Sequence, residues 1–237
     1  MPKAKAKARE KIEAFWLQDE SLTILLIAVI LVVFVAHPLI GTGRLGRPIL
    51  TAAGLLILLS GMLVLSTRAF LSKVGIAFGA ITFLSDVASL RWESTATLVA
   101  RAVATIIFLA LLEAVLAVRV VREGPVNRHR IQGSILLYLL LGLIWSQAYQ
   151  CIALLIPDAF QIAAPFQGIE DMVLKLNYFS FVTLTTVGYG DITAVHPFAR
   201  SLATLEGLTG QLFPAILIAR LVALQIESSR GASSSKG

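Results

Sequence analysis

The sequence predicts an all-α membrane protein. Of its 237 residues, 57% are apolar and only 14% are charged, so the chain has more apolar surface than a soluble domain can bury. A helix needs about 20 residues to cross a bilayer. Six apolar stretches approach or exceed that length: 21–36, 49–66, 73–90, 95–121, 131–156 and 198–226. Between the last two, a shorter helical pattern at 169–182 and a glycine-containing loop predict a helix that enters the membrane and returns.

The first twenty residues form a basic segment ahead of the first apolar stretch. Ile12, Phe15 and Trp16 share one face of a short helix, which predicts a cytoplasmic tail with an interfacial helix that contacts membrane lipid. A cleaved signal peptide is the alternative. The apolar run is too long for one and lacks a small-residue cleavage site, which favours a retained segment.

The charge distribution predicts which side of the membrane each loop occupies. Thirteen of the 20 basic residues lie in the N-terminal tail, the second and fourth loops and the C-terminal tail, whereas five lie in the loops between. Basic residues favour the cytoplasmic side, so both termini are expected there, in a multi-pass protein of the plasma membrane. The net charge of +6 therefore indicates a membrane protein and not one that binds nucleic acid.

The stretch at 183–191, Thr-Leu-Thr-Thr-Val-Gly-Tyr-Gly-Asp, carries the functional prediction. Its core, Thr-Val-Gly-Tyr-Gly, is the general signature of a potassium selectivity filter, in which backbone carbonyls replace the water around the ion. Aiming successive carbonyls to one side needs left-handed backbone angles, which Gly188 and Gly190 can adopt cheaply. Over residues 131–228 the chain resembles the tetrameric potassium channels of the six-transmembrane plan.

This resemblance implies the ion ligands and the assembly. K⁺ would be bound by the Thr186 hydroxyl and by the carbonyls of Thr186, Val187, Gly188 and Tyr189, with Gly190 completing the filter. One chain would line a quarter of the pore, so a homotetramer closes the ring. The fold class expected is therefore six transmembrane helices plus a reentrant pore helix and filter loop. No cofactor beyond the permeant ion is expected.

Residues around the filter are predicted to support it. Tyr178 stands in the pore helix at 169–182 and can offer its hydroxyl to Asp191, whereas Phe179 has no donor for Tyr189. Val182 occupies a position where some relatives carry a glutamate, and this predicts a simpler hydrogen-bond network behind the filter. The remaining supporting residues are Thr183 and Thr185.

The inner helix at 198–226 contains a candidate hinge and a candidate gating acid. Gly210 has the spacing of the family's gating glycine from Gly190, and Pro214 removes the helical hydrogen bond to the Gly210 carbonyl. A static kink held by packing is the alternative. Glu206 is an acid within a predicted span, so it is either a proton-sensitive gating element or a partner for a backbone group of the pore helix. Gln211 is interpreted as a packing or cavity-facing amide.

The domain organisation predicts a channel without a strong voltage sensor. The four spans within 21–122 resemble a sensor domain, but the fourth holds one deep basic residue, Arg101, and steep sensing needs several charges. Arg101 is expected to extend toward the membrane surface or to pair with Asp86 or Glu93, and a lone gating charge is the alternative. The linker at 123–130 is short, which predicts sensor-like domains beside their own pore helices. The tail at 229–237 is expected to be disordered and leaves no room for a soluble ligand-binding domain.

The leading prediction is therefore a passive potassium-selective channel with weak or no voltage dependence. A non-conducting regulatory subunit and a nonselective cation channel are the alternatives. Enzymatic activity has no support, because the sequence shows no paired catalytic acids, Cys–His pair or phosphate-binding loop. The stimulus that opens such a channel does not follow from the sequence.

Overall fold

The computed structural model describes residues 22–36, 52, 54–61, 69–89, 94–121 and 128–234. Residues 22–30 form an α-helix that continues into a π-helical segment, η1 (Leu31–Ala36), and residues 54–61 form a second short helix. The longer helices follow: α4 (Ala69–Ser89), α5 (Thr95–Val121), α6 (Arg128–Leu155), α7 (Ile169–Leu184) and α8 (Pro197–Ser234). The described part of the chain is thus mostly helical, as predicted.

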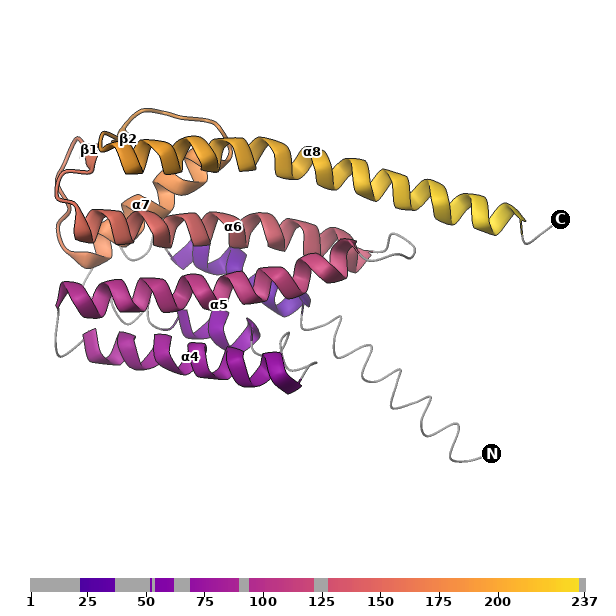
Figure 1. The fold of residues 1–237 in the computed structure, drawn as a ribbon, viewed down its shortest axis with the longest axis horizontal. Coiled ribbons are helices and arrows are strands. Elements are labelled where there is room, and N and C mark those ends of the chain that lie inside the picture. Colours follow the sequence, from indigo (N-terminus) through magenta and orange to yellow (C-terminus); the bar gives the residue numbers. More distant parts are fainter. Residues whose placement is uncertain are drawn as a thin grey trace.

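The helices lie roughly side by side, with the short α7 at one end (Figure 1). Helix α5 packs between α4 and α6, and α7 packs between α6 and α8. The C-terminal ends of α5 and α8 lie at the end opposite the two short strands (Figure 1). The loop after α7 therefore lies toward the end of the molecule that carries the two strands, away from the C-terminal ends of α5 and α8.

Three helices of the described residues are long and apolar enough to cross a membrane: Thr95–Val118, Arg128–Leu155 and Pro197–Ile226. Two shorter apolar helices, Leu22–Val35 and Ile76–Ser85, fall within the first and third predicted spans. The second predicted span, 49–66, is described only in part, and the N-terminal tail lies outside the described residues. The chain therefore has helices suited to a membrane, while the total of six spans stays a prediction.

Two helix boundaries differ from those predicted. Helix α6 begins at Arg128, inside the predicted linker at 123–130. Helix α8 continues to Ser234, so the prediction of disorder is wrong for residues 229–234. Adding a residue to an existing helix costs little compared with starting one, so a Ser-rich tail can continue a long helix although it would not form one alone.

Aromatic packing fixes α7 between its neighbours. Three aromatic rings pack edge to face: Tyr149 of α6, Phe160 from the segment between α6 and α7, and Phe179 of α7. The centroids of each pair lie 4.9–5.8 Å apart. All three side chains are buried. Such pairs add about 0.5–1.5 kcal/mol each beyond the burial of their area. Phe179 therefore anchors α7 in the core and does not face the loop that follows it.

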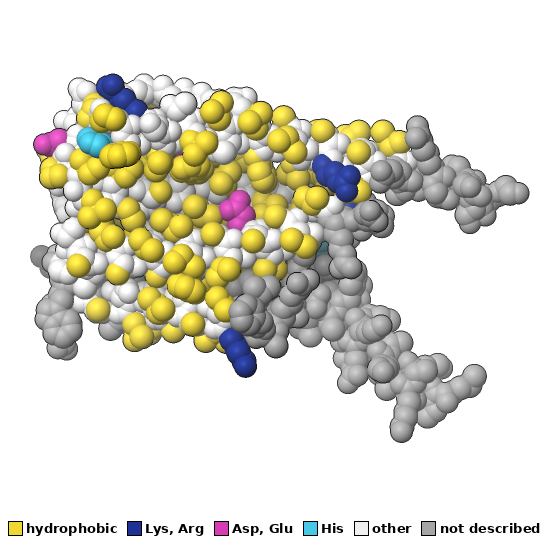
Figure 2. Space-filling model, viewed as in Figure 1, with side chains coloured by type: hydrophobic (Ala, Val, Ile, Leu, Met, Phe, Trp, Pro, Cys, Tyr) yellow, Lys and Arg dark blue, Asp and Glu magenta, His cyan; other side chains and the backbone are white. Residues whose placement is uncertain are grey.

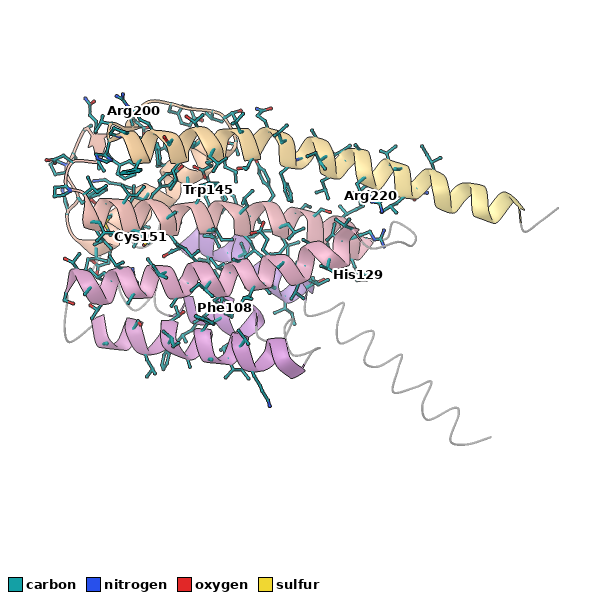
Figure 3. All side chains as sticks on the ribbon, viewed as in Figure 1. Phe108, His129, Trp145, Cys151, Arg200 and Arg220 are labelled. Carbon is teal, nitrogen blue, oxygen red and sulfur yellow. The ribbon has the colours of Figure 1, made fainter. Side chains whose placement is uncertain are left out.

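A small β-ribbon, absent from the sequence prediction, joins the segments on either side of α7. Strand β1 (Phe160–Ile162) pairs antiparallel with β2 (Ile192–Ala194), with Gln161 opposite Thr193. Arg200 lies beside the ribbon (Figure 3), and its Nε donates to the Ala194 carbonyl at 3.1 Å. The ribbon therefore holds the segment before α7 next to the segment that follows the loop after α7.

Candidate functional site

Helix α7 begins with acidic residues and is held at its start by side-chain contacts. Asp171 lies in the first turn, where a negative charge suits the helix dipole. Its Oδ2 accepts hydrogen bonds from the Lys175 ammonium at 2.7 Å and from the Gln167 amide at 2.8 Å. Partial burial raises the pKa of Asp171, but these two bonds and the Lys175 charge outweigh it, so the pKa lies below its usual value of 3.8.

The loop after α7 folds back onto the last turn of the helix. The Thr186 amide donates to the Thr183 carbonyl at 2.9 Å, and the amides of Val187 and Gly188 donate to the Val182 carbonyl at 3.0 and 3.3 Å. The described residues have no cis peptide bond, and in a trans peptide the C=O points opposite to the N–H. The carbonyls of Thr186 and Val187 are therefore directed away from α7.

Backbone angles alternate along the loop. Thr186, Gly188 and Gly190 have φ values of 58°, 58° and 82°, whereas Val187 and Tyr189 between them are not left-handed. A Cβ atom at Gly188 or Gly190 would meet nothing within 4 Å, so the backbone angle and not space favours glycine there. Thr186 is a β-branched residue in the same region, at a cost of about 1–3 kcal/mol. The sequence did not predict this strained residue.

The two neighbouring threonines of the loop point in different directions. Thr185 turns back to α7, where its hydroxyl donates to the Phe181 carbonyl at 2.7 Å. Thr186 instead accepts a hydrogen bond from Nε2 of Gln211 in α8, at 2.8 Å from its Oγ1. Gln211, interpreted from the sequence as a packing or cavity-facing amide, thus contacts the first predicted ion ligand.

Two tyrosines support the ends of the loop. The Tyr138 hydroxyl of α6 donates to the carbonyl of Leu184, the last residue of α7, at 3.1 Å. Tyr178 hydrogen-bonds Asp191 at the end of the loop. Burial first, then this bond and the charges of Asp191 and Tyr189, raise the pKa of Tyr178 above 10.0. The contact between Tyr178 and Asp191 is the pairing that the sequence predicted, whereas Tyr138 was not identified.

Glu206 of α8 is fully buried between three helices. Its Oε2 lies 2.5 Å from the Tyr149 hydroxyl of α6, and its Oε1 lies 2.6 Å from the Ser180 hydroxyl of α7. Ser180 also contacts the Gly142 carbonyl at 2.7 Å. The partner of Glu206 on α7 is thus a side chain and not the backbone group that the sequence predicted. The sequence alone did not identify Tyr149 and Ser180. The available signal was a hydroxyl side chain within an otherwise apolar helix.

The remaining predicted residues lie along the same helices. Gly210 contacts the end of α7, and Pro214 lies inside α8, which is continuous through both positions (Figure 1). Arg101 is partly buried in α5, while Glu93 and the side chain of Asp86, its predicted partners, lie outside the described residues. His129 and Arg220 lie at the end of the molecule opposite Arg200 (Figure 3).

One face of the loop is open in a single chain. Residues 185–191 are all exposed, and Tyr189 reaches 72% exposure. The carbonyl oxygens of Thr186 and Val187 point away from α7, toward this exposed side of the loop. Chemically, such a row of neutral oxygens can coordinate a dehydrated monovalent cation if further ligands come from outside the chain.

Comparison with known families gives a match for this part of the chain. A family model described as "Ion channel" matches residues 137–226, which include α7, the loop and most of α6 and α8. No curated protein and no solved structure matched the chain. Residues 137–226 thus match a family of ion channel domains, which supports the predicted class of function.

Proposed function

We propose that the protein is a potassium-selective channel that conducts K⁺ passively across the plasma membrane. The observation that carries this proposal is the loop at 183–191, whose amides are bound by α7 while the carbonyls of Thr186 and Val187 face the open side. The K⁺ ligands are the Thr186 hydroxyl and the carbonyls of residues 186–189. Because these oxygens replace the hydration shell, the ion enters without a large dehydration cost.

The assembly we propose is a homotetramer. Carbonyls that face lipid without a partner cost several kcal/mol each, so the open face of the loop must face water or other copies. Hydrophobic side chains also spread over the exposed surface of the helices (Figure 2), and along α8 they include Phe198, Leu208, Ile216 and Val222. Closed rotational symmetry lets four such faces surround one axis.

The membrane topology we propose has six spans, with both termini in the cytoplasm and the filter near the outer side. The three long apolar helices and two shorter ones of the described residues support it. Helices α5, α6 and α8 connect alternate ends of the molecule, as antiparallel spans do (Figure 1).

Voltage dependence is proposed to be weak or absent. A charge that crosses the whole field contributes about 2.3 kcal/mol per 100 mV, and α5 carries one deep basic residue, Arg101. The remaining basic residue of α5, Arg119, stands near its C-terminal end. Recording currents over a voltage series in a planar bilayer tests this: a shallow response is expected, and steep opening over several effective charges would refute it.

Flux through the purified full chain in liposomes tests the proposed activity. Vesicles loaded with K⁺ and diluted into K⁺-free medium should lose K⁺ when an ionophore for protons balances the charge. The same vesicles loaded with Na⁺ should retain it. A matched variant, G188A, should abolish the K⁺ flux, because alanine is strained at the φ of 58° found there.

The other outcomes identify the alternatives. Equal flux of K⁺ and Na⁺ would indicate a nonselective cation channel. A correctly assembled protein without flux of either ion at any voltage would indicate a non-conducting regulatory subunit.

A further inference from the structure

Glu206, the buried acid of α8, belongs to a cluster of close oxygen–oxygen contacts. If its carboxyl group is ionised, the cluster has fewer protons than contacts. Three oxygen–oxygen contacts meet here: Tyr149 Oη to Glu206 Oε2 at 2.5 Å, Ser180 Oγ to Glu206 Oε1 at 2.6 Å, and Ser180 Oγ to the Gly142 carbonyl at 2.7 Å. Each distance is that of an O–H···O hydrogen bond, and each such bond needs its own proton.

Counting protons decides the state of the carboxyl group. The Tyr149 and Ser180 hydroxyls supply one proton each, whereas a carbonyl and a carboxylate supply none. With Glu206 ionised, two protons serve three contacts, and Ser180 would face one acceptor oxygen without a hydrogen between them. With a proton on Oε1, Glu206 donates to Ser180, Ser180 donates to Gly142, and Tyr149 donates to Oε2. All three contacts are then satisfied.

We propose that Glu206 is held as a neutral carboxylic acid and that its proton makes it the positioning residue of the pore helix. In this state a chain of hydrogen bonds runs from α8 through Ser180 of α7 to the Gly142 carbonyl of α6. Ser180 stands one turn before Leu184, where α7 ends and the filter loop begins. The proton on Glu206 therefore fixes the helix that presents the filter.

The groups around Glu206 contain no compensating cation. From α6 the titratable groups that face it are Tyr149, by contact, and Tyr138, by electrostatic interaction. From α7 the facing group is the Ser180 hydroxyl, and on α8 the Thr209 hydroxyl binds only the Glu206 backbone carbonyl. Among the described residues no Lys, Arg or His pairs with the carboxyl group. An ionised carboxylate here would be a buried charge without a counter-ion, which is costly.

Loss of the proton rearranges the network in a defined way. The Ser180 hydroxyl then turns its single hydrogen to the carboxylate, and the Gly142 carbonyl loses its contact with α7. The pore helix keeps its bond to α8 but loses this one of its hydrogen bonds to α6. We therefore expect conduction, which belongs to the function proposed above, to fall as the pH rises, because the neutral form supports the filter.

Infrared difference spectroscopy of the purified full chain tests the protonation state directly. The carbonyl band of a protonated carboxylic acid should be present at neutral pH, and its Glu206 component should be lost in E206Q. E113Q is the matched control, since it removes another acid within a long apolar helix and should leave the Glu206 band in place. If wild type and E206Q show the same spectrum in this region at neutral pH, the proposal is overturned.

Flux measurements then test the positioning role. E206Q should conduct like the wild type at neutral pH, because its amide nitrogen can donate to Ser180 while its oxygen accepts from Tyr149, and it should lose the decline at high pH. E206A should lower flux about tenfold, since it removes the contacts of α8 to both Tyr149 and Ser180. S180A should lower flux and flatten the same decline. An inactive but folded E206Q, or one with an unchanged pH profile, would contradict the proposal.

These readouts separate this inference from the proposed activity. The infrared band does not depend on ion flux, so its presence in a chain that conducts no K⁺ would uphold the protonated state and reject the channel. Its absence in a chain that conducts would do the reverse.

Discussion

Gly210 of α8 lies directly against the carbonyl oxygen of Leu184, the last residue of α7. A Cβ atom at position 210 would stand 1.9 Å from that oxygen, far inside any real contact. The same oxygen accepts the Tyr138 hydroxyl at 3.1 Å, so it is held from two sides. Close packing therefore explains this glycine independently of bending. The hinge at Gly210 and Pro214 stays a prediction.

Substituting Gly210 by alanine should destabilise the protein. Alanine forms helices better than glycine by about 1 kcal/mol, so helix propensity alone predicts stabilisation. Overpacking against Leu184 should reverse the sign and cost about 1–3 kcal/mol. Thermal unfolding of the purified variant measures the sign.

G207A provides the matched control, because a Cβ at Gly207 meets nothing within 4 Å among the described residues. It should keep or raise stability. P214A should leave K⁺ over Na⁺ selectivity unchanged, whereas G210A should alter it through the end of α7. A G210A variant as stable as G207A would show that the close contact is not maintained.

Gln211 should tune Thr186, the innermost of the proposed ion ligands. Its amide donates to the Thr186 hydroxyl at 2.8 Å, and Q211L removes that donor. The net value of such a bond, about 0.5–1.5 kcal/mol, corresponds to a change of roughly 2–10-fold in apparent K⁺ affinity. The dependence of conductance on K⁺ at the inner side measures it.

A double-mutant cycle assigns this effect to the pair. T186S keeps the hydroxyl and should remain sensitive to Q211L, whereas T186V lacks the hydroxyl and should be insensitive. Equal effects of Q211L in both backgrounds would mean that Gln211 acts elsewhere.

The sequence predicted the site better where local chemistry decides the structure. Hydropathy located α5 and α6 to within a few residues, and the motif located the loop whose glycines have left-handed angles. The β-ribbon was missed because three-residue strands carry little periodicity. The left-handed angle of Thr186 was missed because threonine rarely adopts it, and only contacts with α7 and α8 hold it there.

The contacts of Glu206 with Tyr149 and Ser180 could not be predicted from the sequence, because they form between residues that are far apart in it. Tyr149 and Ser180 lie 57 and 26 positions from Glu206 in the sequence and meet it only through helix packing. A single sequence identifies the polar residues in apolar helices, but it does not say which of them face one another.

Tyr178 should titrate later than an ordinary tyrosine. Burial, and then its hydrogen bond to Asp191, raise its pKa above 10.0, so the contribution of this bond to stability is complete below pH 10.0 and is lost as the pH rises through the raised value. The phenolate absorbance of the wild type minus that of Y178F measures the transition. D191N should move it back toward 10.0, and a difference titration centred at or below 10.0 would contradict the contact.

Asp171 should make the start of α7 sensitive to acid. Its pKa is below 3.8, so its bonds to Lys175 and Gln167 stabilise the fold above the unfolded value and are lost as the pH falls through the lowered one. A partly exposed pair of this spacing contributes about 0.3–0.5 kcal/mol. Below about pH 4, the unfolding temperature should fall less steeply with decreasing pH in K175M than in the wild type.

D158N serves as the control for this acid response. Asp158 has a φ of 57°, which asparagine tolerates, and it lies outside α7. Its replacement leaves Lys175 and Asp171 in place, so the part of the acid response that comes from this pair should remain. If K175M and D158N behave alike, Lys175 does not hold Asp171.

The central proposal is that four copies of the chain surround K⁺ with the oxygens of the loop. A structure of the full chain in lipid nanodiscs with K⁺ present tests it most directly. We expect a four-fold particle with ion density on the axis between the oxygens of Thr186 and Tyr189, and loss of that density when Na⁺ replaces K⁺. A particle of any other symmetry, or carbonyls of residues 186–189 that turn away from the axis, would contradict it.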